Sequence, residues 1–128
     1  MQPKHPNHDL GQAIVDHINS GAGDDAPLWA KHYHPEFESV EADGMTHKGL
    51  DEIQKKHHEF YDKVQLHSCK ADGPYCGPTG FTVRYTMDIE SKDGQWPRME
   101  MNEIGMYTVK DGKIVREEFM AANPAACE

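Results

Sequence analysis

The chain has 128 residues, with 13 Lys and Arg against 22 Asp and Glu, and its formal net charge is −9 at pH 7. This length fits one domain with its own core, and the acidic balance argues against partners such as nucleic acid or anionic membranes, which require a cationic surface. The hydrophobic fraction is 37%, and the chain contains no apolar run of the roughly 18 residues that a membrane-spanning helix needs.

Targeting and redox features favour a cytoplasmic location. The first ten residues lack the apolar stretch of a signal peptide. The three cysteines, Cys69, Cys76 and Cys127, are irregularly spaced and odd in number, which is typical of free thiols in a reducing compartment. We therefore expect a cytoplasmic protein without structural disulfides.

Two helices are expected near the N-terminus. A loose arm, residues 1–8, precedes Asp9, which can cap a helix whose apolar residues recur at helical spacing. Asp24 or Asp25 can cap a second helix, and Pro35 ends it because the residue before a proline is pushed out of the α region. The apolar members of this second helix are Leu28, Trp29 and Tyr33.

A short strand pair and a third helix come next. The pair covers residues 37–42 and 45–47, with Asp43-Gly44 between them. The third helix begins at Gly49 or Leu50, and one position of its apolar stripe is a histidine, His57.

Four strands follow, at residues 65–71, at 81–90 and as a hairpin over 99–120. The hairpin turn is Asp111-Gly112, the dipeptide that most readily supplies the two positive-φ residues of a type I′ turn. Helices gathered before an antiparallel meander favour an α+β fold. We predict a cone-shaped, curved antiparallel sheet packed around three N-terminal helices, with the wide end of the cone open as a pocket.

The first strand of the hairpin carries a single carboxylate on an otherwise apolar face. Side chains alternate along a strand, so its odd positions share one face. Glu103 is the only charged residue of that face, whose members are Met99, Met101, Glu103, Gly105, Tyr107 and Val109. Burial there would raise the pKa of Glu103 toward neutrality, the range useful for an acid. A structural carboxylate paired with Arg84, Arg98 or a histidine is the alternative.

The order of elements resembles the SnoaL-like polyketide cyclase domains. The likeness rests on Ser39-Val40-Glu41-Ala42, Gly49, His67 and the closing stretch NEIGMYTVKDGKIVREEF, and the domain so identified covers residues 9–122, with 123–128 as a tail. These domains share the nuclear transport factor 2-like fold with ketosteroid isomerase, scytalone dehydratase and limonene epoxide hydrolase. The resemblance implies the cone fold, a homodimer and a pocket for a small, largely apolar molecule.

The resemblance also implies roles for two carboxylates. In ketosteroid isomerases the general base lies on the short strand after the second helix, where this chain has Glu41. A protonated acid on the penultimate strand and a tyrosine of the first helix form the oxyanion hole. Glu103 matches the acid, whereas His17 stands roughly where the tyrosine would be. A one-residue slip in register would exchange Glu41 for Glu38.

The remaining candidates are residues that would orient or enclose a substrate. His67 matches a family position and would act with the two carboxylates. We expect His17, His57, Tyr61, Met101 and Tyr107 to bind substrate. For each of these the alternative is ordinary core packing, which is the commoner role of aromatic and methionine side chains at such spacing.

Cofactor and metal signatures are missing from the sequence. No glycine-rich phosphate loop or nucleophile elbow is present. Neighbouring histidines such as His57-His58 point apart on a helix, which argues against a metal site. These features predict a cofactor-independent isomerase, cyclase or dehydratase that transfers a proton on a small carbonyl compound. The alternative is a non-catalytic module that binds a small molecule or a protein.

Overall fold

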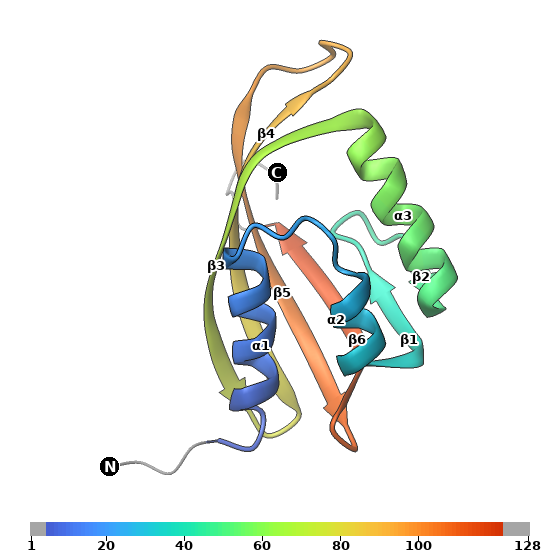
Figure 1. Cartoon of the computed structure of the whole chain (residues 1–128), viewed down its shortest axis with the longest axis vertical. Helices are drawn as coiled ribbons and strands as arrows, with labels where there is room; N and C mark the ends of the chain where they lie inside the picture. The colour runs from blue at the N-terminus through green and yellow to red at the C-terminus, as the bar shows by residue number, and fades with distance from the viewer. Residues whose placement is uncertain (1–4, 122–128) are drawn as a thin grey trace.

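Three helices lie on one side of a single curved sheet of six strands (Figure 1). The computed structural model describes residues 5–121. The helices are α1 (His8–Asn19), α2 (Ala26–His32) and α3 (Gly49–Lys63), and they confirm the predicted α+β fold. Helix α1 begins at the last residue of the predicted arm, and the predicted tail lies outside the described residues.

Helix α1 packs closely on β3 and β4. Its Ile14 is 1% exposed, and a Cβ added at Gly11 would come within 2.5 Å of the Cβ of Pro74, so only glycine permits this approach. The residue that precedes the first turn is Asn7, so the prediction of Asp9 as the cap was wrong. Asp9 lies in the first turn instead, where its charge suits the positive end of the helix dipole.

Helix α2 is shorter than predicted. Asp25 precedes it as expected, but the helix ends at His32. Tyr33, predicted to be helical, is the first residue of β1 (Tyr33–Val40). Strand β1 pairs antiparallel with β2 (Thr46–Lys48), which confirms the short strand pair.

The other strands are β3 (Val64–Gly77), β4 (Gly80–Ser91), β5 (Met99–Lys110) and β6 (Lys113–Ala121). The order across the sheet is β2-β1-β6-β5-β4-β3, and the predicted antiparallel meander from β3 to β6 is confirmed. The sheet is not antiparallel throughout, because β1 and β6 pair parallel. No turn joins these two strands, so no local signal in the sequence reports their relative direction.

Strand β3 continues past its predicted end at Ala71. The register of its pairing with β4 shifts between Asp72 and Tyr75, and pairing then resumes as far as Gly77. The Asp72-Gly73-Pro74 segment is thus a bulge within the strand rather than a turn after it.

The β5–β6 hairpin has the predicted turn and one irregularity. Asp111 and Gly112 have φ angles of 52° and 76°, as a type I′ turn requires. Val109 lies opposite Ile114, but its neighbour Thr108 lies opposite Arg116, so one residue of β6, Val115, is extra. This β-bulge reverses the faces of all later β6 residues.

The hydrophobic core lies between the helices and the sheet face that they cover. Its least exposed side chains, at 1% or less, come from α1, β1, β4 and β6: Ile14, Phe37, Val83 and Ile114. In the part of the chain from residue 5 to 121, no helix has the length and apolar composition that crossing a membrane requires.

Candidate active site

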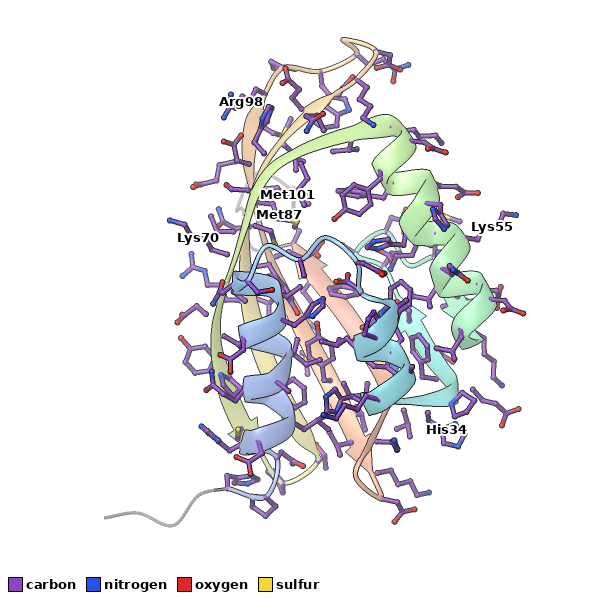
Figure 2. All side chains as sticks on the ribbon, in the orientation of Figure 1. His34, Lys55, Lys70, Met87, Arg98 and Met101 are labelled. Atoms are coloured by element: carbon purple, nitrogen blue, oxygen red, sulfur yellow. The ribbon has the colours of Figure 1, made fainter. Side chains whose placement is uncertain are left out.

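A cavity of about 730 Å³ lies between the helices and the covered face of the sheet. Its volume is in the range of sites for small organic molecules. Side chains of all three helices and of strands β1 and β3 to β6, or of residues just beyond them, line it. Met87 and Met101, cross-strand partners on β4 and β5, form part of its apolar wall and lie close together in Figure 2.

Glu103 faces the cavity, as the alternation along β5 predicted. Burial raises the pKa of its carboxyl group to about 7, and the negative charge of Glu41 adds to the shift, whereas the Lys56 ammonium opposes it. Glu103 does not pair with Arg98, which binds Asp88 through two hydrogen bonds of 2.9 and 2.7 Å. Arg84 lies opposite Ile104, whose side chain points to the other face of the sheet. Glu103 therefore exists in both protonated and ionised forms near neutral pH.

Glu41 also lines the cavity, and the register question at this strand is answered in its favour. It follows the last residue of β1, and its carboxylate forms an ion pair with Lys56 of α3. Glu38 is on the opposite face, 3.8 Å from Arg116. The ammonium of Lys56 thus holds a carboxylate charge next to Glu103.

Sequence reasoning missed Glu117, a further carboxyl group of the cavity. Glu117 is 4% exposed and accepts hydrogen bonds from the Tyr33 hydroxyl at 2.8 Å and from the Ser39 hydroxyl at 2.9 Å. Burial raises its pKa, while Lys56 and these two hydrogen bonds oppose the shift. A regular hairpin would have placed Glu117 outside, so only the bulge at Val115 brings it into the cavity.

Two tyrosines of the sheet, Tyr85 and Tyr107, also line the cavity. The hydroxyl groups of Tyr85 and Tyr107 are hydrogen-bonded to each other, and burial raises the pKa of both. Gly105 makes room for them, because a Cβ there would come within 3.0 Å of both rings. Both phenols thus come from the sheet, on β4 and β5, and not from the first helix.

The side of the cavity that the three helices form is the helix wall. It carries a cluster in which Asp25, a residue not predicted for the site, lies between two predicted histidines, His17 and His57. His17 Nε2 lies 2.9 Å from one oxygen of Asp25, and His57 Nδ1 lies 3.8 Å from the other. The His57 ring contacts Trp29 and Tyr61 edge-on, at centroid distances of 5.3 and 4.7 Å. All five side chains line the cavity.

His67 also lines the cavity, but its partner is not one of the predicted catalytic carboxylates. Its Nε2 is 2.7 Å from a carboxylate oxygen of Glu90 on the neighbouring strand. Between residues 5 and 121, no three His, Cys, Asp or Glu side chains are arranged to hold a metal ion.

Comparison with known proteins agrees with this architecture. Residues 28–121 match the profile of the SnoaL-like domain. The chain belongs to the SnoaL-like domain family. The family profile thus spans most of α2, all of α3 and all six strands, which confirms the family resemblance seen in the sequence. No curated protein matches the chain.

Several solved structures share the fold of this SnoaL-like domain. A protein from Mesorhizobium loti, provisionally named a SnoaL-like polyketide cyclase (carbohydrate phosphatase), is 28% identical, with a TM-score of 0.69 over 87% of this chain and 92% of that one. An NTF2-like protein of unknown function from Burkholderia pseudomallei is 15% identical, with a TM-score of 0.75 over 93% and 94% of the two chains. A ketosteroid isomerase-like fold protein from Catenulispora acidiphila, solved with trimethylamine, is 12% identical, with a TM-score of 0.69 over 91% and 85%.

Proposed function

We propose that this SnoaL-like domain is a cofactor-independent enzyme that transfers a proton on a small carbonyl compound, as an isomerase, cyclase or dehydratase. The observation that carries the proposal is Glu103, a carboxyl group with a pKa of about 7 in a largely apolar cavity. A base whose pKa lies near the working pH combines a populated ionised form with a strong drive to take a proton.

The chemical step uses the groups around Glu103. The ionised carboxylate takes a proton from the carbon next to the substrate carbonyl, the C–H electron pair becomes a C=C bond, and the carbonyl oxygen becomes an enolate oxygen. A hydroxyl of the Tyr85–Tyr107 pair donates a hydrogen bond to that oxygen, since only one of the two hydroxyl protons is used within the pair. Protonated Glu103 then returns the proton to another carbon.

Glu41 is the second carboxylate of the proposal. The sequence suggested it as the general base, with Glu103 as the acid. Its carboxylate is engaged in the ion pair with Lys56, so we assign proton abstraction to Glu103. The charge of Glu41 would then keep the pKa of Glu103 near neutrality.

The other predicted residues would enclose the substrate. His17, His57 and Tyr61 would contact it from the helix wall, and Met101 and Tyr107 from the sheet. His67, engaged by Glu90, would contact the substrate from β3. The substrate would be largely apolar, because Leu28, Ile53, Leu66 and Phe119 line the same cavity.

A second candidate is a module that binds a small amine without turnover. Glu103 and Asp25 face a cavity rich in aromatic rings, and such rings attract organic cations. The similar fold from Catenulispora acidiphila holds trimethylamine. Under this reading trimethylamine would shift the NMR signals of cavity residues, and the protein would accelerate no proton transfer.

Ring opening of 5-nitrobenzisoxazole tests the enzyme proposal. A base removes the proton from its ring carbon, the N–O bond breaks and a coloured phenolate forms, so no natural substrate is needed. We expect the rate to rise through pH 7 and to fall about 100-fold in Glu103→Gln. The exposed Glu100→Gln variant on the same strand is the control. An unchanged rate in Glu103→Gln, or no rate above free carboxylate in the wild type, refutes the proposal.

We also propose a homodimer, as the family resemblance implies. The sheet face that the helices leave uncovered carries the exposed Met106 and the partly exposed Ile104. Light scattering of the purified protein measures the oligomeric state, and Met106→Lys should shift it toward the monomer.

A further inference from the structure

The cluster formed by His17, Asp25 and His57 has no part in the step described above. It joins three segments at the helix wall: α1, the residue before α2, and α3. The side chains of His17, Asp25 and His57 are 19%, 25% and 23% exposed, so solvent reaches each of them only in part. A carboxylate placed between two imidazoles in a ligand-sized cavity is an arrangement suited to proton transfer.

The connection between α1 and α2 runs from the end of α1 across to the start of α2 (Figure 1), and its last residue, Asp25, lines the cavity. Gly21 and Gly23 both have a φ of 72°, a conformation that side-chain-bearing residues rarely adopt. These two glycines let the chain reverse direction directly after α1. Asp25 can therefore face His17, a residue of the helix that the chain has just left.

The negative charge of Asp25 acts inside the cavity. It contributes to the raised pKa values of Tyr61 on the helix wall and of Cys69 and Tyr85 on the sheet wall. A charge that acts on groups of both walls will also act on a ligand between them. Asp25 is thus a cavity group and not only the residue that precedes α2.

The surroundings of His57 give its two ring nitrogens different roles. Nδ1 is the nitrogen nearest Asp25, and Trp29 and Tyr61 hold the ring on two sides. Within residues 5–121, the polar contact of the His57 ring runs through Nδ1, and none involves Nε2. Nδ1 thus faces the carboxylate at 3.8 Å, and Nε2 remains for a molecule in the cavity.

We infer that His57 is a second acid–base group of the cavity, positioned by Asp25 on the helix wall while Glu103 acts from the sheet wall, and that it protonates a departing oxygen of the substrate. The inference rests on the proposed function and narrows the substrate to compounds that lose an oxygen leaving group beside the ionising C–H bond, such as β-hydroxy carbonyl compounds. Asp25 acts through His57 and is a positioning residue.

The step balances without an added reactant. Glu103 takes the C–H proton, and the C–H electron pair forms a new C=C bond. The electron pair of the breaking C–O bond passes to the oxygen, which receives the Nε2 proton of the imidazolium and leaves as water. Neutral His57 then regains a proton from solvent, and Glu103 releases one.

Two probes with different leaving groups separate this role from that of Glu103. The oxygen of 5-nitrobenzisoxazole departs as a weakly basic phenolate that gains little from an acid, whereas the oxygen of unsubstituted benzisoxazole is more basic and gains more. We expect His57→Gln and Asp25→Asn to slow the unsubstituted probe at least tenfold more than they slow the nitro probe. Glu103→Gln should slow both equally.

The control is Asp24→Asn, which changes an exposed neighbour whose Oδ1 accepts the Ala26 N–H, a hydrogen bond that asparagine can keep. Imidazole ¹⁵N shifts of His57 give a readout independent of turnover. In the neutral ring they should report the proton on Nδ1 in the wild type and a mixture of the two tautomers in Asp25→Asn. The inference is wrong if His57→Gln slows both probes equally or slows neither. It is also wrong if the ¹⁵N shifts of His57 are the same in Asp25→Asn as in the wild type. If Glu103→Gln slows neither probe, the proposed function fails instead.

Discussion

Glu117 lies directly opposite Tyr107 across the β5–β6 hairpin, in the position that Arg116 would occupy in a regular hairpin. The extra residue, Val115, turns the carboxyl group of Glu117 inward, where Tyr33 and Ser39 bind it, and turns Arg116 outward toward Glu118, 2.9 Å away. The bulge therefore places the acidic Glu117, and not the basic Arg116, in the cavity.

The hydrogen bond between Tyr33 and Glu117 should contribute measurably to stability. Removing the hydroxyl in Tyr33→Phe leaves one buried oxygen of Glu117 without its donor, which should lower the free energy of unfolding by about 1–3 kcal/mol. Urea denaturation measures this change. Tyr75→Phe, at an exposed tyrosine on β3, should cost far less. Equal losses in the two variants would contradict the buried hydrogen bond.

Stability should fall as pH rises through the range in which Glu103 titrates. Its pKa is raised from 4.5 to about 7, so between these values the folded protein binds more protons than the unfolded chain. Well above pH 7, the cost of ionising it in the fold should approach about 3 kcal/mol. Thermal unfolding from pH 5 to pH 8 should show a smaller pH dependence in Glu103→Gln than in the wild type and Glu100→Gln. A slope unchanged in Glu103→Gln would assign the titration to another group.

Lys56 should set the pKa of Glu103 from the opposite wall. Its ammonium group lowers that pKa, so Lys56→Met should move the midpoint above the value of about 7 by removing the only opposing cause. ¹³C NMR titration of the Glu103 carboxyl carbon measures the midpoint directly. Lys55→Met is the matched control, because Lys55 projects away from the cavity on the outer side of α3 (Figure 2). A midpoint that stays in place in Lys56→Met would exclude this coupling.

Gly105 should be intolerant of even one methyl group. A Cβ at this position would lie 2.9 Å from the Tyr107 ring and 3.0 Å from the Tyr85 ring. We expect Gly105→Ala to displace the phenol pair, to cost about 1–3 kcal/mol of stability and to slow the benzisoxazole reaction. Gly77→Ala, where a Cβ meets nothing within 4 Å, is the control. Wild-type stability and rate in Gly105→Ala would show that the pair has room to move.

Sequence patterns predicted the features that depend only on neighbouring residues, such as the faces of a strand and the type of a turn. The alternation of Met101, Glu103 and Tyr107 along β5 placed a carboxyl group in the cavity, and Asp111-Gly112 gave the correct turn. Glu117 was missed because the face of a residue after a bulge depends on one inserted position, which no periodicity reveals. The parallel pairing of β1 with β6 was missed because it joins strands far apart in the chain.

The helix wall was only half predictable for a related reason. His17 and His57 stood out as histidines at core positions of helices. Asp25 was predicted only as a helix cap, because aspartate is common at that position and needs no further role to account for it. Its second role depends on the reversal at Gly21 and Gly23, which brings it to His17 and His57.

The parallel contact between β1 and β6 also determines when the cavity can exist. Tyr33 and Glu117 are separated by 84 positions, so Tyr33 is synthesised long before its partner. Until β6 has been made and has docked between β1 and β5, the cavity lacks the wall that carries Glu117 and Phe119. A ligand of this cavity can therefore stabilise only the finished domain, and it cannot assist the growing chain.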